Sequence, residues 1–234
     1  MNSENNFETF LSISNNEFLI FTKDKNNDKK LFENKLMFEE TEIGKNLILL
    51  DKFVNENIFK IEKIIKGFVN NIIIIIDCFE ELKIGTSFKK KSYEKSFSKD
   101  DLNHLLYDSK NQIKANYDNW FIAHMIITQY IINDKKYDYL PADVDSEYIC
   151  LDIDFICFSR EYLKKLEKIL NKYHIKIKQF VSANYIKNCF KNDKINIFSM
   201  CEKIIGGYNK NEIFLVPKYK KNNGFFEKFF NFFS

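Results

Sequence analysis

The sequence predicts an α/β or α+β fold in which strands alternate with about three helices. Residues 72–76 are five consecutive isoleucines, and such a run without alternation indicates a strand covered on both faces. Residues 120–132 are rich in β-branched and aromatic side chains, which is typical of a second, longer strand. Apolar side chains in residues 163–170 recur at helical spacing and indicate an amphipathic helix. We therefore expect mixed sheets with helices packed on them.

In the first third of the chain, residues 18–22 and 30–38 are expected to be two strands of a hairpin, joined by the polar turn 23–29. A short apolar run, 47–50, comes next. It is followed by a helix of about 15 residues, which Asn55 or Asn57 is expected to cap. The core face of this helix is predicted to consist of Ile58, Ile61, Ile65 and Phe68. The isoleucine strand 72–76 follows directly.

The middle of the chain begins with an extended segment, 81–93, that we expect Gly85 to break. Residues 98–101 resemble a capping box and predict the start of a helix. Its inward face would hold Leu102, Leu105, Leu106 and Ile113. The strand 120–132 should then end at a turn formed by residues 133–135.

Residues 148–158 predict a further strand, after which Ser159 is expected to cap a helix that extends to residue 173. The inward face of that helix is predicted to consist of Leu163, Leu166, Ile169 and Leu170. Ile175, Ile177 and Val181 alternate with polar residues in the next expected strand. Residues 195–200 and 213–216 are short apolar segments, and Gly206-Gly207 between them predicts a turn.

Composition excludes several classes of protein. The chain has 234 residues, which allows one large domain or two small ones. A formal net charge of +3 with 29% charged residues does not indicate nucleic acid as a partner. Five cysteines without a C-x-x-C pair are typical of reduced, buried thiols in a cytosolic protein. The acidic, polar N-terminus is not typical of a signal peptide, and no apolar run is long enough to span a membrane.

Two aspartates are the strongest candidates for chemistry. Asp152 and Asp154 lie two residues apart in a predicted strand, so both carboxylates share one face, as a metal-dependent transferase requires. Asp143 or Asp145 could supply a third acid. The alternative, which we favour, is the solvated face of a half-buried strand. His124 is expected to be a hydrogen-bonded core or edge histidine instead of a ligand, and the three histidines lie too far apart in sequence to predict a metal site.

The last residues predict a membrane-binding amphipathic helix. At 100° per residue the phenylalanines of residues 225–233 fall within an arc of roughly 160°. Lysines precede this segment, and Lys228 lies on the opposite, polar side of the helix, as in interfacial anchors. The predicted membrane-binding residues are Phe225, Phe226, Phe229, Phe230, Phe232, Phe233, Lys218, Lys220, Lys221 and Lys228. Partial immersion of the phenylalanines would contribute on the order of 5–10 kcal/mol. Alternatively, the helix packs on its own core or forms a self-association seam.

The order of these elements resembles the FtsA family, the actin-like membrane tethers of the bacterial division ring. Residues 44–51, a glycine, an apolar run and Asp51, are similar to the lead-in to the family's first helix. Residues 71–77 resemble the strand that leaves the first actin subdomain. Residues 98–113 and 123–134 resemble a helix and a strand of the inserted subdomain that the family calls 1C.

The resemblance continues through residues 156–159, the helix after them, and residues 175–183, which are similar to the strand that returns to subdomain 1A. It implies a partial actin-like (RNase H-like) subdomain 1A in residues 1–80 and 175–216. Residues 81–174 would form the 1C-like insertion, and residues 217–234 a linker and the membrane-targeting helix.

The chain departs from the family where ATP would bind. Actin-type ATPases cradle phosphate with Asp-x-Gly-Thr/Ser on the first hairpin, but residues 11–16 contain neither Asp nor Gly. Residues 195–200 lack the Asp and Gly of the second phosphate loop. The chain also ends too early for a second actin lobe, and the family's Pro-Gly-Met-Gly segment is not matched at residues 141–148. We therefore expect no cofactor and a lost ATP site.

The resemblance implies a non-catalytic adaptor of cell division, peripheral on the cytoplasmic face of the cell membrane. Its partners would be that membrane, other division proteins and a second copy of itself, with no nucleic acid. Two alternatives remain, namely a pilus assembly platform of the PilM type and a small metal-dependent transferase that uses Asp152 and Asp154.

Overall fold

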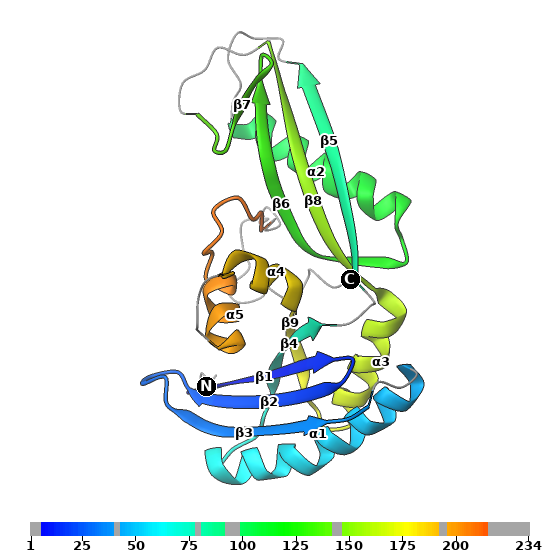
Figure 1. Cartoon of the computed structure of the whole chain (residues 1–234), viewed down its shortest axis with the longest axis vertical. Helices are drawn as coiled ribbons and strands as arrows, with labels where there is room; N and C mark the ends of the chain where they lie inside the picture. Colours follow the sequence, from blue (N-terminus) through cyan, green and yellow to red (C-terminus); the bar gives the residue numbers. More distant parts are fainter. Residues whose placement is uncertain are drawn as a thin grey trace, which may run out of the picture.

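The computed structural model describes residues 6–39, 43–77, 81–91, 99–141, 147–191 and 196–214, which form two sheets with helices packed on them (Figure 1). This arrangement confirms the α/β fold class. The larger sheet has five strands in the order β3-β2-β1-β4-β9. β1, β2 and β3 are antiparallel neighbours, whereas β1, β4 and β9 run parallel. The strands are β1 (Phe7–Ser14), β2 (Glu17–Asp24), β3 (Lys30–Met37), β4 (Asn71–Asp77) and β9 (Lys176–Ser182).

The hairpin expected from residues 18–22 and 30–38 is confirmed as β2 and β3, while β1 is a strand that the sequence pattern did not predict. β1 lies between β2 and β4 and pairs with both. Its place in the sheet therefore depends on pairing with segments distant in sequence, which a local pattern does not report.

Helices α1 (Ile43–Ile65) and α3 (Arg160–Asn171) cover one face of this sheet, and α4 (Ala183–Cys189) and α5 (Ile197–Ile205) cover the other (Figure 1). β4 contributes to both cores. Ile72, Ile74 and Ile76 pack with α1 and α3, whereas Ile73 and Ile75 pack with α4 and α5. No isoleucine of the run 72–76 is more than 1% exposed. The prediction of a strand covered on both faces is confirmed.

Helix α1 corrects the predicted start of the first helix. It begins at Ile43, well before the expected caps, and includes the apolar run 47–50. Asn57 lies inside the helix and is fully buried; its Nδ2 donates to the Phe53 carbonyl at 2.7 Å. Its Oδ1 accepts a bond from Asn34 Nδ2 on β3, also at 2.7 Å. The polar group is satisfied by tertiary contact instead of capping a helix end. Phe68 is 76% exposed and is not part of the core face.

Helix α3 follows the prediction closely at its start. Ser159 Oγ accepts the Tyr162 N–H at 3.3 Å, which makes Ser159 the N-cap. All four inward residues of the prediction are buried: Leu163, Leu166, Ile169 and Leu170. They pack with α1 on the five-stranded sheet. This helix, which the sequence grouped with residues 81–174, therefore shares the core of the larger sheet.

The second sheet is antiparallel, with the order β5-β8-β6-β7. Its strands are β5 (Glu81–Lys91), β6 (Trp120–Ile132), β7 (Lys135–Tyr137) and β8 (Tyr148–Ser159), and α2 (Lys99–Asn116) packs on one face (Figure 1). β6 has the bounds that were predicted. Asn133 and Asp134 have φ of 47° and 65°. Both residues of the predicted turn thus adopt left-handed backbone conformations, as the tight turns of β-hairpins require. The inward residues Leu105, Leu106 and Ile113 of α2 are buried.

Gly85 does not break β5, which corrects a second expectation. The strand continues through it, and Gly85 pairs with Asp154 of β8. A Cβ atom at Gly85 would lie 3.3 Å from Asp154 Oδ1. The glycine therefore allows a close approach across the sheet instead of interrupting it.

Two short helices, α4 and α5, were not predicted. Residues 197–200 belong to α5, where Phe198, Cys201 and Ile204 are buried. Asn196 caps α5, since its Oδ1 accepts the Ser199 N–H at 2.9 Å. The predicted turn at Gly206-Gly207 is confirmed, with Gly207 at a φ of 84°.

Candidate functional site

The carboxyl ends of β1, β4 and β9 lie at one edge of the five-stranded sheet, where open α/β sheets usually bind ligands. The β1–β2 turn at this edge is closed by its own side chains. Ser14 Oγ lies 3.1 Å from both Asn16 Oδ1 and the Glu17 carbonyl oxygen. The turn contains no glycine, so its backbone is not shaped for the close approach of a phosphate.

The other two strand ends at this edge carry side chains that bind residues of neighbouring elements. Asp77, at the end of β4, accepts a bond from Lys187 Nζ at 2.5 Å. Ser182 Oγ, at the end of β9, donates to Glu81 Oε2 at 2.5 Å, and Asn184 Nδ2 lies 3.5 Å from Glu81 Oε1. Ser182 also caps α4 directly after β9, again without a glycine. The polar groups of this edge are thus largely engaged within the protein.

A buried polar cluster joins the two sheets. We call it the junction cluster and define it as His124, Ser182, Tyr185, Asn209 and Glu212. His124 of β6 is 1% exposed, and its Nδ1 lies 2.7 Å from Glu212 Oε1. Tyr185 of α4 donates its hydroxyl to Glu212 Oε2 at 2.8 Å and accepts a bond from Asn209 Nδ2 at 2.9 Å.

The hydrogen bonds assign the tautomer of His124. The backbone N–H of Ser182 donates to His124 Nε2 at 3.0 Å, so Nε2 carries no hydrogen. The ring hydrogen is therefore on Nδ1, which donates to Glu212 Oε1. A proton on His124 Nε2 as well would point at the backbone N–H of Ser182, so two donors would face each other. Of the core and edge positions expected for a hydrogen-bonded His124, the structure shows the core one.

Burial shapes the acidity of the cluster. Burial, followed by the charge of the neighbouring Glu212 carboxylate, raises the pKa of Tyr185 far above its usual range. The phenol therefore remains a hydrogen-bond donor to Glu212 at all ordinary pH values. Glu212 is 7% exposed, and both of its oxygens accept a hydrogen bond. A buried carboxylate whose oxygens both accept hydrogen bonds stabilises the contact between the elements that it joins.

Backbone pairing reinforces this junction. The N–H of Ile127 donates to the Asn211 carbonyl at 2.9 Å, and the N–H of Ile213 donates to the Met125 carbonyl at 2.8 Å. Residues near Glu212 are thereby held against β6. Phe121 and Phe180 pack edge to face nearby, with ring centroids 5.9 Å apart. The chain thus holds the four-stranded sheet against the five-stranded one through polar, backbone and aromatic contacts.

The candidate carboxylates of the transferase alternative share one face of β8, as the strand pattern predicts. Asp152 accepts a bond from Ser87 Oγ at 2.5 Å, and Asp154 forms an ion pair with Lys83 Nζ at 2.8 Å. Ile153, between them, is buried in the core of this sheet. Within the described residues, no group of three or more His, Cys, Asp or Glu side chains could hold a metal ion. The candidate third acids, Asp143 and Asp145, lie outside the described residues.

The cysteines differ from the expectation of uniform burial. Cys157 and Cys201 are buried, but Cys150 and Cys189 are only partly so, and Cys78 lies outside the described residues. Burial raises the pKa of Cys157 to about 12. Burial also raises the pKa of Cys201 and, to a smaller extent, that of Cys150. None of these three thiols is activated as a nucleophile.

The predicted membrane-binding residues, from Lys218 to Phe233, all lie outside the described residues. Among the helices that are described, none is both long and apolar enough to cross a bilayer.

Sequence reasoning found His124 but missed its partners Tyr185, Asn209 and Glu212. Glu212 lies 88 residues from His124, directly before the short apolar run 213–216. A single acidic residue in such a context has no periodicity that would distinguish it. Its role therefore emerges only from the folded chain.

No family model matches the sequence, and no curated protein matches it. Solved structures show a likeness. The cytoplasmic domain of EpsL, an inner membrane component of the type II secretion system of Vibrio cholerae, is 8% identical with a TM-score of 0.37, covering 77% of this chain and 58% of that one. The PilM–PilN type IV pilus biogenesis complex is 7% identical with a TM-score of 0.47, covering 76% of this chain and 48% of the matched one.

A third structure, a Bacteroides thetaiotaomicron protein with an actin-like ATPase fold, is 13% identical with a TM-score of 0.33, covering 82% of this chain and 58% of that one. This chain spans about half the length of these three structures, 48–58%. All TM-scores lie below 0.5 and all identities below 25%, so no function passes from these structures to this chain.

Proposed function

We propose that the protein is a non-catalytic, membrane-tethered adaptor of bacterial cell division, similar in plan to FtsA. The five-stranded sheet would be its partial actin-like subdomain 1A. The four-stranded sheet, inserted between β4 and β9, would be its 1C-like part and would bind division proteins or a second copy of the chain. The tail would hold this assembly on the cytoplasmic face of the membrane.

The observation that carries the non-catalytic part is the carboxyl edge of the five-stranded sheet. In actin-type ATPases glycine-containing turns at this edge cradle phosphate. Here the β1–β2 turn has no glycine and closes through Ser14, and the end of β9 continues directly into α4. Asp77 and Glu81 are engaged by Lys187 and Ser182. These contacts support a scaffold without an ATP site.

The junction cluster supports the adaptor part of the proposal. An adaptor has to hold a partner-binding part at a set orientation to its attachment point. The bonds of Glu212 to His124 and Tyr185 are buried, so they are costly to break and restrict movement between the sheets. The inserted sheet would therefore move with the rest of the protein.

Sedimentation with vesicles of phosphatidylcholine and phosphatidylserine tests the tethering. A chain that ends after Lys221 should remain in the supernatant while the full chain sediments. The variant Phe226→Ser/Phe229→Ser/Phe233→Ser should weaken binding by about 150-fold or more, since each phenylalanine contributes ~1 kcal/mol or more when partly immersed. Asn231→Ser, in the same segment, is the matched control and should bind like the wild type. Equal sedimentation of the full and shortened chains would remove the tail from the proposal.

The cellular role is tested separately. Deletion of the gene should produce filamentous cells, and a fluorescent fusion should gather at the division site. Loss of pili with normal cell length would contradict the division role and favour a pilus platform. Titration calorimetry with ATP and Mg²⁺ should give no binding heat, and micromolar binding would refute the loss of the ATP site.

A further inference from the structure

Positive charge is concentrated on the helical layer formed by α1 and α3. Residues 43–66 and 160–172 contain ten lysines and arginines but five aspartates and glutamates, a net charge of +5, whereas the whole chain carries +3. The rest of the chain is therefore net negative by two charges. All ten basic residues are exposed. α1 and α3 pack on the same face of the five-stranded sheet, so this charge lies on one side of the protein (Figure 1).

The basic side chains of α1 are not neutralised locally. In the described part of the chain, no ion pair involves any of its lysines or Lys66 just after it. Two of the three acids of this helix are occupied elsewhere. Asp51 pairs with Lys172, the residue after α3, at 2.5 Å, and Glu62 accepts the Val69 N–H at 3.2 Å. Glu56 alone remains exposed among the acids of α1.

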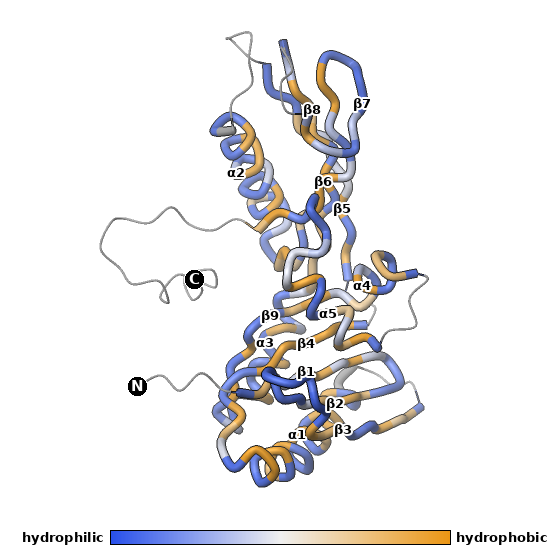
Figure 2. The backbone as a smooth tube through the Cα atoms, turned by 90° about the vertical axis from the view of Figure 1, so that its left-hand side faces the viewer, coloured by the Kyte–Doolittle hydropathy of each residue, from blue (hydrophilic) through white to orange (hydrophobic). Residues whose placement is uncertain are grey.

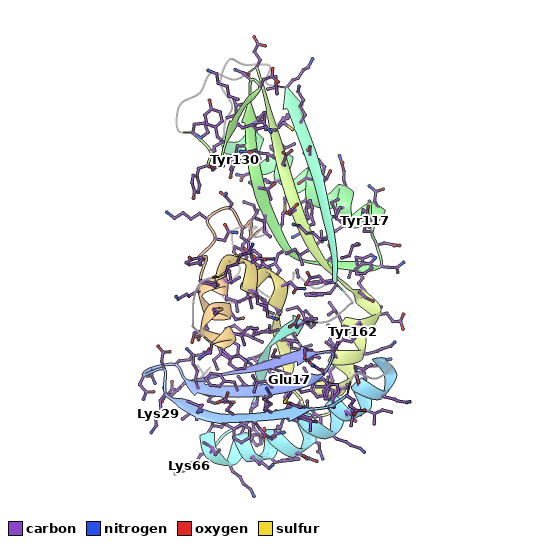
Figure 3. The ribbon with its side chains drawn as sticks, viewed as in Figure 1. Glu17, Lys29, Lys66, Tyr117, Tyr130 and Tyr162 are labelled. Atoms are coloured by element: carbon purple, nitrogen blue, oxygen red, sulfur yellow. The ribbon has the colours of Figure 1, made fainter. Side chains whose placement is uncertain are left out.

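Large apolar side chains lie among these lysines. Ile48 is 62% exposed and Phe59 is 58% exposed. They are separated by three helical turns and therefore differ by only about 20° around the helix. Lys52 and Lys63 fall within roughly 60° of Ile48 on the same stripe. Figure 2 shows hydrophobic and hydrophilic residues alternating along α1, and Figure 3 places Lys66 at the outer end of this helix.

We propose that this stripe is a second membrane contact, which binds the headgroups of anionic lipids. We call it the α1 surface, and it consists of Lys45, Ile48, Lys52, Phe59, Lys63 and Lys66. The lysines would lie at the headgroup level, while Ile48 and Phe59 enter the boundary with the acyl chains. This inference rests on the proposed function, because it gives the tethered protein an orientation as well as an attachment.

Two features favour an anionic membrane as the occupant. Exposed large apolar groups surrounded by lysines are the pattern of interfacial helices, and the tail repeats it with its phenylalanines and Lys218, Lys220, Lys221 and Lys228. In addition, stable anchoring usually takes two signals, and a second contact on the same chain binds at high effective concentration. Contact through both would hold α1 against the membrane.

Charge reversal tests the α1 surface in the full chain. Each lysine near an anionic surface contributes about a fivefold increase in partitioning, so Lys52→Glu/Lys63→Glu should weaken binding to phosphatidylserine-containing vesicles by about 30-fold or more. Lys135→Glu/Lys136→Glu changes the net charge equally, on exposed residues of β7 in the other sheet, and should retain most of the binding. Equal losses in both variants would overturn the proposal, because the effect would then be one of net charge.

The depth of position 59 in the membrane is measured with the variant Phe59→Trp and vesicles that contain brominated lipids. The tryptophan fluorescence of this variant should be quenched when vesicles are added. Tyr107→Trp on α2 is the matched control, since Tyr107 is 59% exposed and Phe59 is 58% exposed. Quenching at neither position, or equally at both, would overturn the proposed orientation.

The two proposals fail in different ways. If truncation after Lys221 abolishes sedimentation while the α1 variants bind normally, the tail anchor stands and the α1 surface is refuted. If the α1 variants lose binding while truncation has no effect, the α1 surface stands and the tail anchor is refuted. Circular dichroism of each variant checks that the fold is retained, and Ile48→Ser provides a second variant that leaves the charge unchanged.

Discussion

Replacement of Tyr185 by phenylalanine tests how the two sheets are held together. The change removes a hydroxyl that donates to Glu212 Oε2 at 2.8 Å and accepts from Asn209 Nδ2 at 2.9 Å. Glu212 then keeps only its bond to His124, and one buried oxygen has no donor. Loss of a hydrogen bond to a charged group costs about 1.5–3 kcal/mol, to which the unpaired amide adds little because Asn209 is partly exposed.

We therefore expect Tyr185→Phe to lower the free energy of unfolding by about 2–3 kcal/mol, measured by urea denaturation. For a chain of this size the melting temperature should fall by about 4–12 °C. Amide hydrogen exchange should accelerate at Ser182, Ile127 and Ile213, whose N–H groups bond across the junction.

Tyr208→Phe is the matched control, because Tyr208 is 54% exposed and its loss of a hydroxyl should change stability by less than about 0.5 kcal/mol. The reasoning is refuted if the two variants unfold at the same urea concentration and show the same exchange at the junction amides. Such a result would mean that the polar cluster does not hold the sheets together.

Three further predictions concern the core, a helix cap and pH. Ile74→Ala, at a fully buried position of β4, should cost about 2–5 kcal/mol in urea denaturation. Ser159→Ala removes the cap of α3 and should cost about 1 kcal/mol, with faster amide exchange at Tyr162. Burial raises the pKa of Cys157 from 9.0 to about 12. The folded thiol therefore keeps its proton where the unfolded thiol loses it. The contribution of this thiol to the stability of the fold is fully present below pH 9 and is lost as the pH rises from 9 to 12. Cys157→Ala should reduce this slope, and an unchanged slope would refute the assignment.

The elements that the sequence predicted correctly are those whose pattern is local. The bounds of β6 follow from an uninterrupted β-branched and aromatic run that ends at Asn133 and Asp134. α3 follows from a serine cap and a leucine repeat. In each case the residues that decide the structure are neighbours in sequence, so the pattern and the structure coincide.

The errors occur where distant contacts override local preference. Asn57 has the character of a helix cap, but Asn34 on β3 satisfies it inside α1, so the helix extends well before it. The strand β1 depends on β2 and β4 on either side. Residues 197–200 become helical because α5 buries Phe198 and Cys201 against the larger sheet.

In the candidate site, too, local features could be predicted and contacts between distant residues could not. That His124 is a satisfied core residue could be predicted, because a lone histidine in an apolar strand needs partners when buried. Its partners could not, since Glu212 is 88 residues away. Likewise, the lysines of α1 were visible in the sequence, but their common exposed stripe required the true start of the helix at Ile43.

From the order of residues alone follow the fold class, the isoleucine strand and the absence of glycine from the turns, because each depends on composition or on short-range periodicity. The folded chain adds the contacts that depend on long-range packing. It brings His124, Tyr185 and Glu212 together between the sheets and places α1 and α3 side by side as a basic surface. Both arise because burial of apolar faces brings distant segments into contact, and polar groups trapped there must then satisfy one another.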